Sequence, residues 1–309
     1  MNRTQADAPE QSGFGPGTAL LLVDPQRDFV NGHRGALPVP GAEALLPVLN
    51  RLSAAAAGAG AAVAASADWH PPDHVSFYTS HPASRPGQVV SVAVDGRQAE
   101  IRLFSPHCVA GTPGAQFAEG LDVTHVSHTV LKGTDAALES LSAFHDIAGA
   151  RSTGLAEWLR QQRVRTLFVC GVVAEFCVRA SVLDGLEAGF RVALLTDAVA
   201  GVDAAACQAA LQEMERAGAV LVHSRELLQQ QPGPGQASKT AGQALQAVAW
   251  LEAAGREKAA RATGSTAVGT AAMAPPIRAA GQEVLPCVVK ERRVLATAAV
   301  SAGPACDGG

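Results

Sequence analysis

Short apolar runs and helix-length segments alternate along residues 18–222. Six runs have the length and continuous apolar character of buried strands, and they cover residues 18–23, 61–66, 126–131, 166–170, 190–195 and 219–222. The segments that suit helices are residues 41–58, 153–162, 174–188 and 203–217. Strands that alternate with helices favour parallel βαβ units with right-handed crossovers. The pattern therefore predicts an α/β fold, a three-layer α/β/α sandwich around a mostly parallel six-stranded sheet.

The pattern changes near residue 228. The segment QQQPGPGQASKT has the composition of a linker, and Ala, Gly and Thr dominate the residues after it. We expect residues 229–309 to be a low-complexity, partly disordered extension in which 241–262 could form a helix. Residues 1–17 are expected to be a flexible N-terminal segment. These assignments leave residues 18–228 as one folded domain, which is expected to carry the catalytic activity.

Composition narrows the class of ligand. The net charge is -4 with the signs interspersed, whereas a nucleic-acid-binding protein normally carries a basic face. We therefore expect a small, weakly charged ligand and no nucleic-acid partner. No apolar run approaches the roughly 18 residues of a membrane span, the first residues lack a signal-peptide pattern, and the six cysteines show no tight repeated spacing. A cytoplasmic protein with reduced thiols and no membrane partner is expected.

Three reactive side chains lie just beyond the carboxyl ends of predicted strands. Asp24 and Lys132 follow two strands directly, and Cys177 lies in the first turn of the helix after a third. Ligands of open α/β sheets bind outside those ends, so we expect the three side chains to project toward one crevice. A helix N-terminus and Lys132 would lower the pKa of the Cys177 thiol. Asp24 could then act as general base, while the N–H groups of Val173 and Cys177 could stabilise an oxyanion.

Each of these residues also has an ordinary structural explanation. Cys177 could be a buried structural thiol, as free cysteines commonly are. Asp24 could cap a turn, and Lys132 could be a surface lysine before a glycine. Their shared position at strand ends is what favours a function. The other cysteines of the domain are interpreted as structural, namely Cys108, Cys170 and Cys207.

A second cluster contains side chains that bind metals. Asp68 and His70 are two residues apart in DWHPPDH, so in an extended segment both face the same way. His107 follows in SPHCVAGTPGAQF. One carboxylate and two imidazoles suit Zn²⁺, Fe²⁺ or Mn²⁺. A lone Asp-x-His pair is a weak signal, and His74 is interpreted as a packing or supporting residue.

Five stretches carry a family likeness across residues 18–225. They are ALLLVDPQRDFV, SADWHPPDHVSF, PHCVAGTPGAQF, LKGTD with LSAFHD, and GVVAEFCVRASVLDGLEAGFRV followed by LLTDAVAGV. In this order they resemble the nicotinamidase/pyrazinamidase branch of the isochorismatase-like cysteine hydrolases. The resemblance implies a catalytic triad of Asp24, Lys132 and Cys177, an oxyanion hole at Val173 and Cys177, and one divalent metal ion bound by Asp68, His70 and His107.

The resemblance also implies a substrate and a reaction. In that family the metal binds a pyridine nitrogen, and the cysteine attacks the carboxamide carbon to give a thioester. Conversion of nicotinamide to nicotinate and ammonia, a step of NAD salvage, is thus expected, with Zn²⁺ favoured over Fe²⁺ or Mn²⁺. The ring would stack between Phe29 and Phe104. Phe104 stands where the family usually has Trp, and Leu141 stands where Tyr is common.

Two other interpretations stay open at this stage. One is a metal-free hydrolase of another small carboxamide or ureido compound, which the Asp68, His70 and His107 set disfavours. The other is a non-catalytic scaffold of the same fold, with the C-terminal extension as its interaction segment. A cis peptide at Val172–Val173 is implied by the family likeness alone. A homo-oligomer is left open, because the sequence favours no particular assembly.

Overall fold

The computed structural model describes residues 13–94, 96–147, 149 and 151–229. Its centre is a six-stranded sheet in the order β5-β2-β1-β6-β7-β8. The strands are β1 (Thr18–Val23), β2 (Ala62–Asp68), β5 (His128–Lys132), β6 (Thr166–Val172), β7 (Arg191–Ala200) and β8 (Val220–Val222). All pairings within this sheet are parallel. The predicted six-stranded sheet is confirmed.

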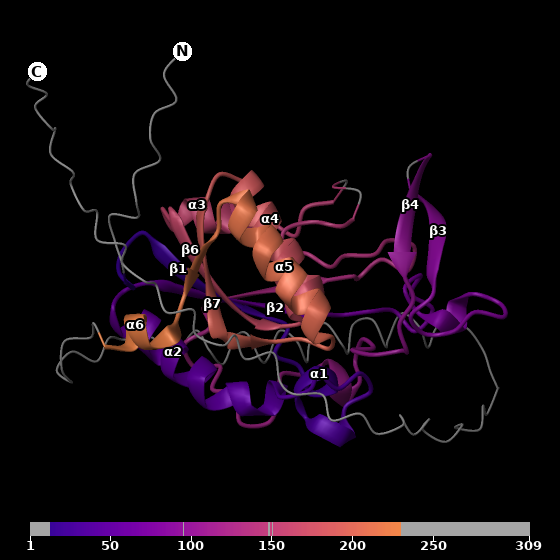
Figure 1. The fold of residues 1–309 in the computed structure, drawn as a ribbon, viewed down its shortest axis with the longest axis horizontal. Helices are drawn as coiled ribbons and strands as arrows, with labels where there is room; N and C mark the ends of the chain where they lie inside the picture. The colour runs from indigo at the N-terminus through magenta and orange to yellow at the C-terminus, as the bar shows by residue number, and fades with distance from the viewer. Residues whose placement is uncertain (1–12, 95, 148, 150, 230–309) are drawn as a thin grey trace, which may run out of the picture.

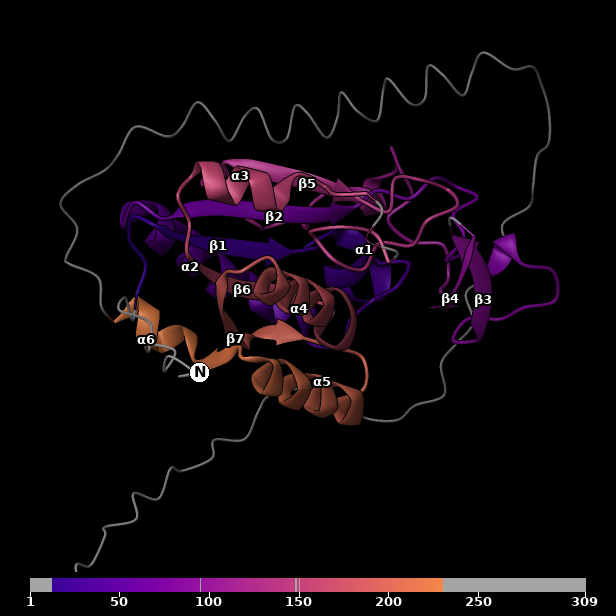
Figure 2. The ribbon, with the colours of Figure 1, turned by 90° about the horizontal axis from the view of Figure 1, so that it is seen from above.

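Helices cover both faces of the sheet, as Figures 1 and 2 show. One face carries α2 (Leu46–Gly58) and α6 (Ser224–Leu228), and the other carries α3 (Leu155–Gln161), α4 (Arg179–Glu187) and α5 (Ala204–Ala217). Successive strand residues point to opposite faces, so β1 contributes Leu20 to the core beneath α2 and Leu21 to the core beneath α3, α4 and α5. The predicted three-layer sandwich is therefore confirmed.

The region between β2 and β5 contains structure that the apolar pattern does not predict. Its longest element is the antiparallel hairpin of β3 (Val89–Val94) and β4 (Arg97–Arg102), which projects from one end of the molecule (Figures 1 and 2). β3 (VVSVAV) is largely apolar yet mostly exposed or half-buried, and β4 (RQAEIR) is mostly polar, so the hairpin does not follow the pattern of the buried strands. A short helix, α1 (Arg27–Val30), follows β1 and was likewise not predicted.

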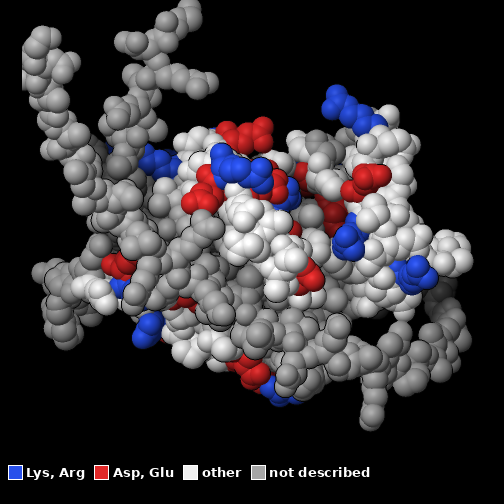
Figure 3. All heavy atoms as spheres, in the orientation of Figure 1, with Lys and Arg blue, Asp and Glu red and all other residues white. Residues whose placement is uncertain are grey.

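The outer surface carries charges of both signs. On the face in Figure 3, acidic and basic side chains are interspersed over a mostly uncharged surface. Among the residues that the structure describes, no helix has the length and apolar character needed to span a bilayer. Residues 1–12 and 230–309 lie outside the described residues, and with them most of both expected terminal segments and the helix expected at 241–262.

Candidate active site

Three strand ends place Asp24, Lys132 and Cys177 side by side. Asp24 follows β1, Lys132 is the last residue of β5, and Cys177 lies in a π-helical turn, Ala174–Val178, directly after β6. The Nζ of Lys132 is 3.0 Å from Asp24 Oδ2 and 3.4 Å from Cys177 Sγ. All three side chains are buried. The structure thus brings together the three residues that their positions at strand ends single out.

Asp24 has the surroundings expected of a general base. Its Oδ1 accepts a hydrogen bond of 2.6 Å from the Ser66 hydroxyl, while its Oδ2 faces Lys132. Burial raises the pKa of Asp24 to about 6, although the positive charge of Lys132 opposes that rise. A carboxyl oxygen of Asp24 lies within 4.8 Å of Cys177 Sγ. At neutral pH this carboxylate is ionised, yet basic enough to accept a proton.

The Cys177 thiol departs from the sequence-based expectation. Proximity to a helix N-terminus and to Lys132 predicts a lowered pKa, and this prediction is wrong. Burial raises the pKa of Cys177 well above the ordinary thiol value, and the charge of Lys132 only partly offsets it. The resting sulfur is consequently a thiol, and any reaction through it requires a base such as Asp24 to remove the proton.

Lys132 connects the triad to a second group of residues. Burial alone would lower the pKa of this ammonium group, but the carboxylates of Asp24 and Asp68 outweigh burial and raise it well above its usual value. The Nζ of Lys132 donates to Asp68 Oδ1 at 2.5 Å and to the Ser140 carbonyl at 3.1 Å. A permanent cation therefore lies between two buried carboxylates.

Asp68, His70 and His107 form a group with the chemistry of a metal site. Asp68 ends β2, and the Nε2 atoms of His70 and His107 lie 3.5 Å and 3.9 Å from its carboxylate oxygens. Ligand atoms of the three buried residues all lie within 4.8 Å of one another. The opposite ring nitrogens face carbonyl oxygens, since His70 Nδ1 is 3.0 Å from Gly133 O and His107 Nδ1 is 2.8 Å from Ser105 O. A ring that donates from Nδ1 keeps its Nε2 lone pair for a metal ion, so these residues fit a divalent cation.

The protonation states of this group also suit a cation. Burial favours the neutral form of Asp68, but the charges of Lys132 and His70 outweigh burial and hold its pKa below the ordinary value. Burial, assisted by the charge of His70, lowers the pKa of His107 to about 4. The pKa of His70 is raised, because Asp68 outweighs the opposing effect of burial. Metal binding would use the Asp68 carboxylate and neutral His107 directly and displace a proton from His70.

His74 lies beside the metal-type group without belonging to it. Its Nδ1 is 2.7 Å from the Ser76 hydroxyl, and its Nε2 is 3.0 Å from the Leu138 carbonyl. Its ring centroid lies 4.2 Å from that of His70. Both ring nitrogens are occupied, so the interpretation of His74 as a supporting residue is confirmed.

Two residues that hold the site together were missed in the sequence. The side chain of Gln26 donates to Asp68 O at 2.7 Å and accepts from Asp68 N at 2.7 Å, which fixes the end of β2. Asp28 accepts from Cys108 N at 2.8 Å through Oδ2 and from Ala36 N at 3.0 Å through Oδ1. No local pattern marks these two residues, because they lie in the polar stretch DPQRD and their partners are 42 and 80 residues away.

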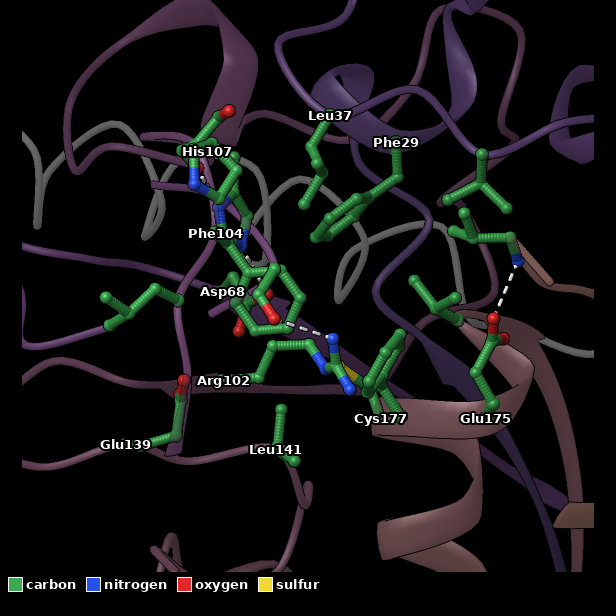
Figure 4. Close-up of a pocket in the computed structure, with 18 of the residues that line it drawn as sticks. Phe29, Leu37, Asp68, Arg102, Phe104, His107, Glu139, Leu141, Glu175 and Cys177 are labelled. Atoms are coloured by element: carbon green, nitrogen blue, oxygen red, sulfur yellow. Dashed lines mark hydrogen bonds and ion pairs between the residues drawn. The ribbon is translucent and has the colours of Figure 1, made fainter. Parts of the chain in front are cut away.

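A cavity of about 460 Å³ opens above these two groups, with mainly apolar walls (Figure 4). The rings of Phe29 and Phe104 line it, and Phe104 meets Phe176 edge-to-face with centroids 5.5 Å apart. Leu141 lines the same cavity. The side chains of Asp68, His107 and Cys177 also reach the cavity, so a bound molecule would contact both groups at once.

The backbone before Cys177 contains an unusual peptide bond. The Val172–Val173 peptide bond is cis, as the family likeness implies. Val173 lines the cavity together with Cys177. The two residues assigned to an oxyanion hole from the sequence therefore lie at the same wall of the cavity.

Comparisons with known proteins point to one family. The model of the Isochorismatase domain matches residues 18–226. A nicotinamidase of Escherichia coli is 38% identical over 211 residues, which are 67% of this chain and 94% of that relative. PnC1 from L. infantum, solved in complex with nicotinate, has a TM-score of 0.60 and 35% identity and covers 70% of this chain and 97% of that chain. A pyrazinamidase of Pyrococcus horikoshii was solved in complex with zinc. It has a TM-score of 0.55 and 35% identity, and the match covers 67% of this chain and 99% of that chain.

Proposed function

This chain belongs to the isochorismatase family, and on that premise we propose that it is a metal-dependent amidohydrolase that converts nicotinamide to nicotinate and ammonia. The observation that carries the proposal is the contact of Lys132 with both Asp24 and Cys177, beside a metal-type group that lines the same apolar cavity as Cys177. The E. coli relative is a nicotinamidase by name, and the L. infantum structure contains nicotinate. We propose that residues 18–228 carry the whole activity.

The substrate would bind through its ring. Phe29 and Phe104 offer aromatic faces for the pyridine ring, and offset or edge contacts between rings are favourable. Asp68, His70 and His107 would hold one divalent ion, for which we favour Zn²⁺ over Fe²⁺ or Mn²⁺. When bound, that ion would supply a Lewis acid that anchors the pyridine nitrogen.

The triad would carry out the bond-breaking steps. Asp24 removes the proton from the Cys177 thiol, and the sulfur attacks the amide carbon. The N–H groups of Val173 and Cys177 stabilise the resulting oxyanion. Asp24 returns the proton to the departing ammonia, which leaves a thioester on Cys177. Asp24 next activates a water molecule that hydrolyses the thioester to nicotinate.

Lys132 supports this cycle without transferring a proton. Its ammonium group is 3.4 Å from Cys177 Sγ and 3.0 Å from Asp24 Oδ2. A positive charge at that distance stabilises the thiolate at the moment of attack and the Asp24 carboxylate between proton transfers. The raised pKa of Lys132 keeps this charge in place at every pH at which the enzyme would work.

The Cys177→Ala variant tests this proposal. Ammonia release from nicotinamide should fall by about 10³-fold or more, because no other group in the cavity replaces the nucleophile. Bound metal, measured by element analysis, should not change. Cys170→Ala is the matched control, since Cys170 is a buried thiol of β6 that does not line the cavity, and it should keep full activity. Turnover by Cys177→Ala would remove Cys177 as the nucleophile.

A further inference from the structure

The turn that carries the nucleophile holds a carboxylate that the proposed chemistry does not use. Glu175 lies two residues before Cys177 in the π-helical turn and lines the cavity. Its Oε1 accepts hydrogen bonds from the N–H groups of Val202 and Asp203, each at 2.9 Å. Its Oε2 accepts from the Cys207 thiol at 3.3 Å. Figure 4 shows this carboxylate beside the turn, joined to the neighbouring segment.

All three donors come from one stretch of chain that follows β7. Val202 and Asp203 are the last residues before α5, and Cys207 lies in its first turns. The N-terminus of a helix attracts negative charge, because its N–H groups are unpaired and its dipole is positive there. Glu175 therefore ties the nucleophile turn to the start of α5, 27 residues further along the chain.

The absence of a side chain at Gly201 leaves the space that the Glu175 carboxylate occupies. A Cβ atom at Gly201 would lie 2.2 Å from Glu175 Oε2 and 2.2 Å from Cys207 Sγ. Side-chain atoms do not approach that closely, so any residue other than glycine would displace the carboxylate or the thiol. Position 201 must therefore remain a glycine for Glu175 to reach all of its donors.

We propose that Glu175 is a positioning residue, which fixes the Ala174–Val178 turn so that Cys177 Sγ stays beside Asp24 and Lys132. This inference rests on the proposed role of Cys177 as nucleophile. Cys177 is held through its own turn, whereas Asp24 and Lys132 are each at the end of a strand. The turn is followed by α4, and Glu175 joins the turn itself to the start of α5, whereas the Arg179–Glu213 pair joins α4 to α5 beyond the turn. Without Glu175 the sulfur would shift relative to its base.

The experiment compares three variants in the full-length, metal-loaded protein. Glu175→Ala removes all three bonds, and Gly201→Ala should displace the same carboxylate. Both should lower kcat on nicotinamide by roughly 10- to 100-fold, since misplacement by about 1 Å costs this much. KM and bound metal should stay within about twofold of wild type, because neither the ring wall nor the metal group changes. Glu175→Gln keeps the Oε1 acceptor and should restore most of kcat.

A matched control separates positioning from general loss of packing. Glu213 of α5 pairs with Arg179 of α4, so it is a second carboxylate that joins the region of the nucleophile to α5, but at the surface. Glu213→Ala should leave kcat unchanged, since exposed pairs contribute little. Thermal unfolding would show whether each variant is folded at the assay temperature. If Glu175→Ala does not fold, the kcat values of Gly201→Ala and Glu175→Gln still test the positioning role of Glu175.

Alkylation of Cys177 by iodoacetamide tests the inference even if nicotinamide is not the substrate. The rate is followed by mass spectrometry of the Cys177 peptide over a range of pH. In Glu175→Ala and Gly201→Ala the profile should move to higher pH, because the thiol loses contact with Asp24 and Lys132. An unchanged profile and unchanged kcat in both variants would overturn the positioning role. So would a Glu175→Gln variant as impaired as Glu175→Ala.

Discussion

The proposed site has two halves that are built in different ways, a nucleophile half (Asp24, Lys132, Cys177) and a metal half (Asp68, His70, His107). In the nucleophile half, Asp24 and Lys132 are at strand ends, and Cys177 is one turn beyond β6. In the metal half, only Asp68 is at a strand end, while His107 comes from the long segment between β4 and β5. The parallel sheet positions Asp24 and Lys132 directly, and it positions Cys177 through the turn that follows β6. The second half depends on side chains that bond to the backbone, such as Asp28 to Cys108 N.

The electrostatics of the two halves differ in the same way. In the nucleophile half burial dominates, so the pKa of Asp24 rises to about 6 and that of Cys177 rises well above its usual value. In the metal half the pKa of Asp68 is lowered, and that of His107 falls to about 4. One half therefore retains a proton to move, whereas the other presents the Asp68 carboxylate and a neutral His107 ring and would lose a proton from His70 on binding a metal ion. Lys132 forms ion pairs with Asp24 in one half and Asp68 in the other, so a change of charge in one half affects the pKa values of the other.

His107→Ala should give the largest difference between the halves. It removes one of the three proposed ligands, so bound metal and nicotinamide turnover should fall together, turnover by about 10²-fold or more. Alkylation of Cys177 should continue, because its neighbours Asp24 and Lys132 are unchanged. Element analysis and an ammonia assay measure the first two effects.

The matched control for that variant is His81→Ala. The His81 ring contacts the Val75 carbonyl and lies outside the metal-type group, so both metal and turnover should persist. Unchanged metal content in His107→Ala would show that the ligand assignment is wrong. Full nicotinamide turnover after removal of metal by a chelator would contradict a metal-dependent reaction.

Asp28→Asn should weaken metal binding by a smaller factor. The substitution keeps the shape of the side chain but can place an amide N–H against Cys108 N–H, next to His107. Groups that orient metal ligands typically contribute about 10- to 100-fold to affinity, and we expect a loss in this range. Titration of the metal-free protein with Zn²⁺ measures it. Asp122→Asn is the control, since the Asp122 carboxylate accepts hydrogen bonds from the N–H and hydroxyl of Thr124, and a loss there of equal size would contradict a specific role for Asp28.

The pH dependence of Cys177 alkylation should reveal the coupling between the halves. Asp24 accepts the thiol proton only when ionised, and burial raises its pKa to about 6. In the metal-free protein the rate should therefore fall about tenfold per pH unit below pH 6 and level off above it. A cation held at Asp68 stabilises the Asp24 carboxylate, so metal should move the inflection to lower pH. An inflection that does not move with metal would show that the two halves are electrically independent.

The sequence predicts the strand-built half better than the other. The six strands are apolar runs long enough to be recognised, and the positions of Asp24 and Lys132 follow from them. The hairpin β3–β4 does not follow this rule, because β3 (VVSVAV) is apolar but mostly not buried, β4 (RQAEIR) is polar, and the two strands form a separate two-stranded sheet. The roles of Asp28 and Glu175 depend on partners 80 and 27 residues away, which no local pattern encodes. The error in the pKa of Cys177 has the same origin, since the depth of burial is a property of the assembled fold.

Phe104→Trp should give the smallest effect. It tests whether the ring of Phe104 stacks on the substrate. Phe104 stands between the two halves, with its ring 5.8 Å from that of His107 and 5.5 Å from that of Phe176. A Trp ring offers more area, and an aromatic pair contributes about 0.5–1.5 kcal/mol beyond burial. KM for nicotinamide should therefore fall roughly threefold, while kcat stays constant, because stacking acts equally on substrate and transition state. KM for a small aliphatic amide should not change, since that compound has no ring to stack. A raised or unchanged KM for nicotinamide would mean that Phe104 packs against Phe176 and His107 without contacting the substrate.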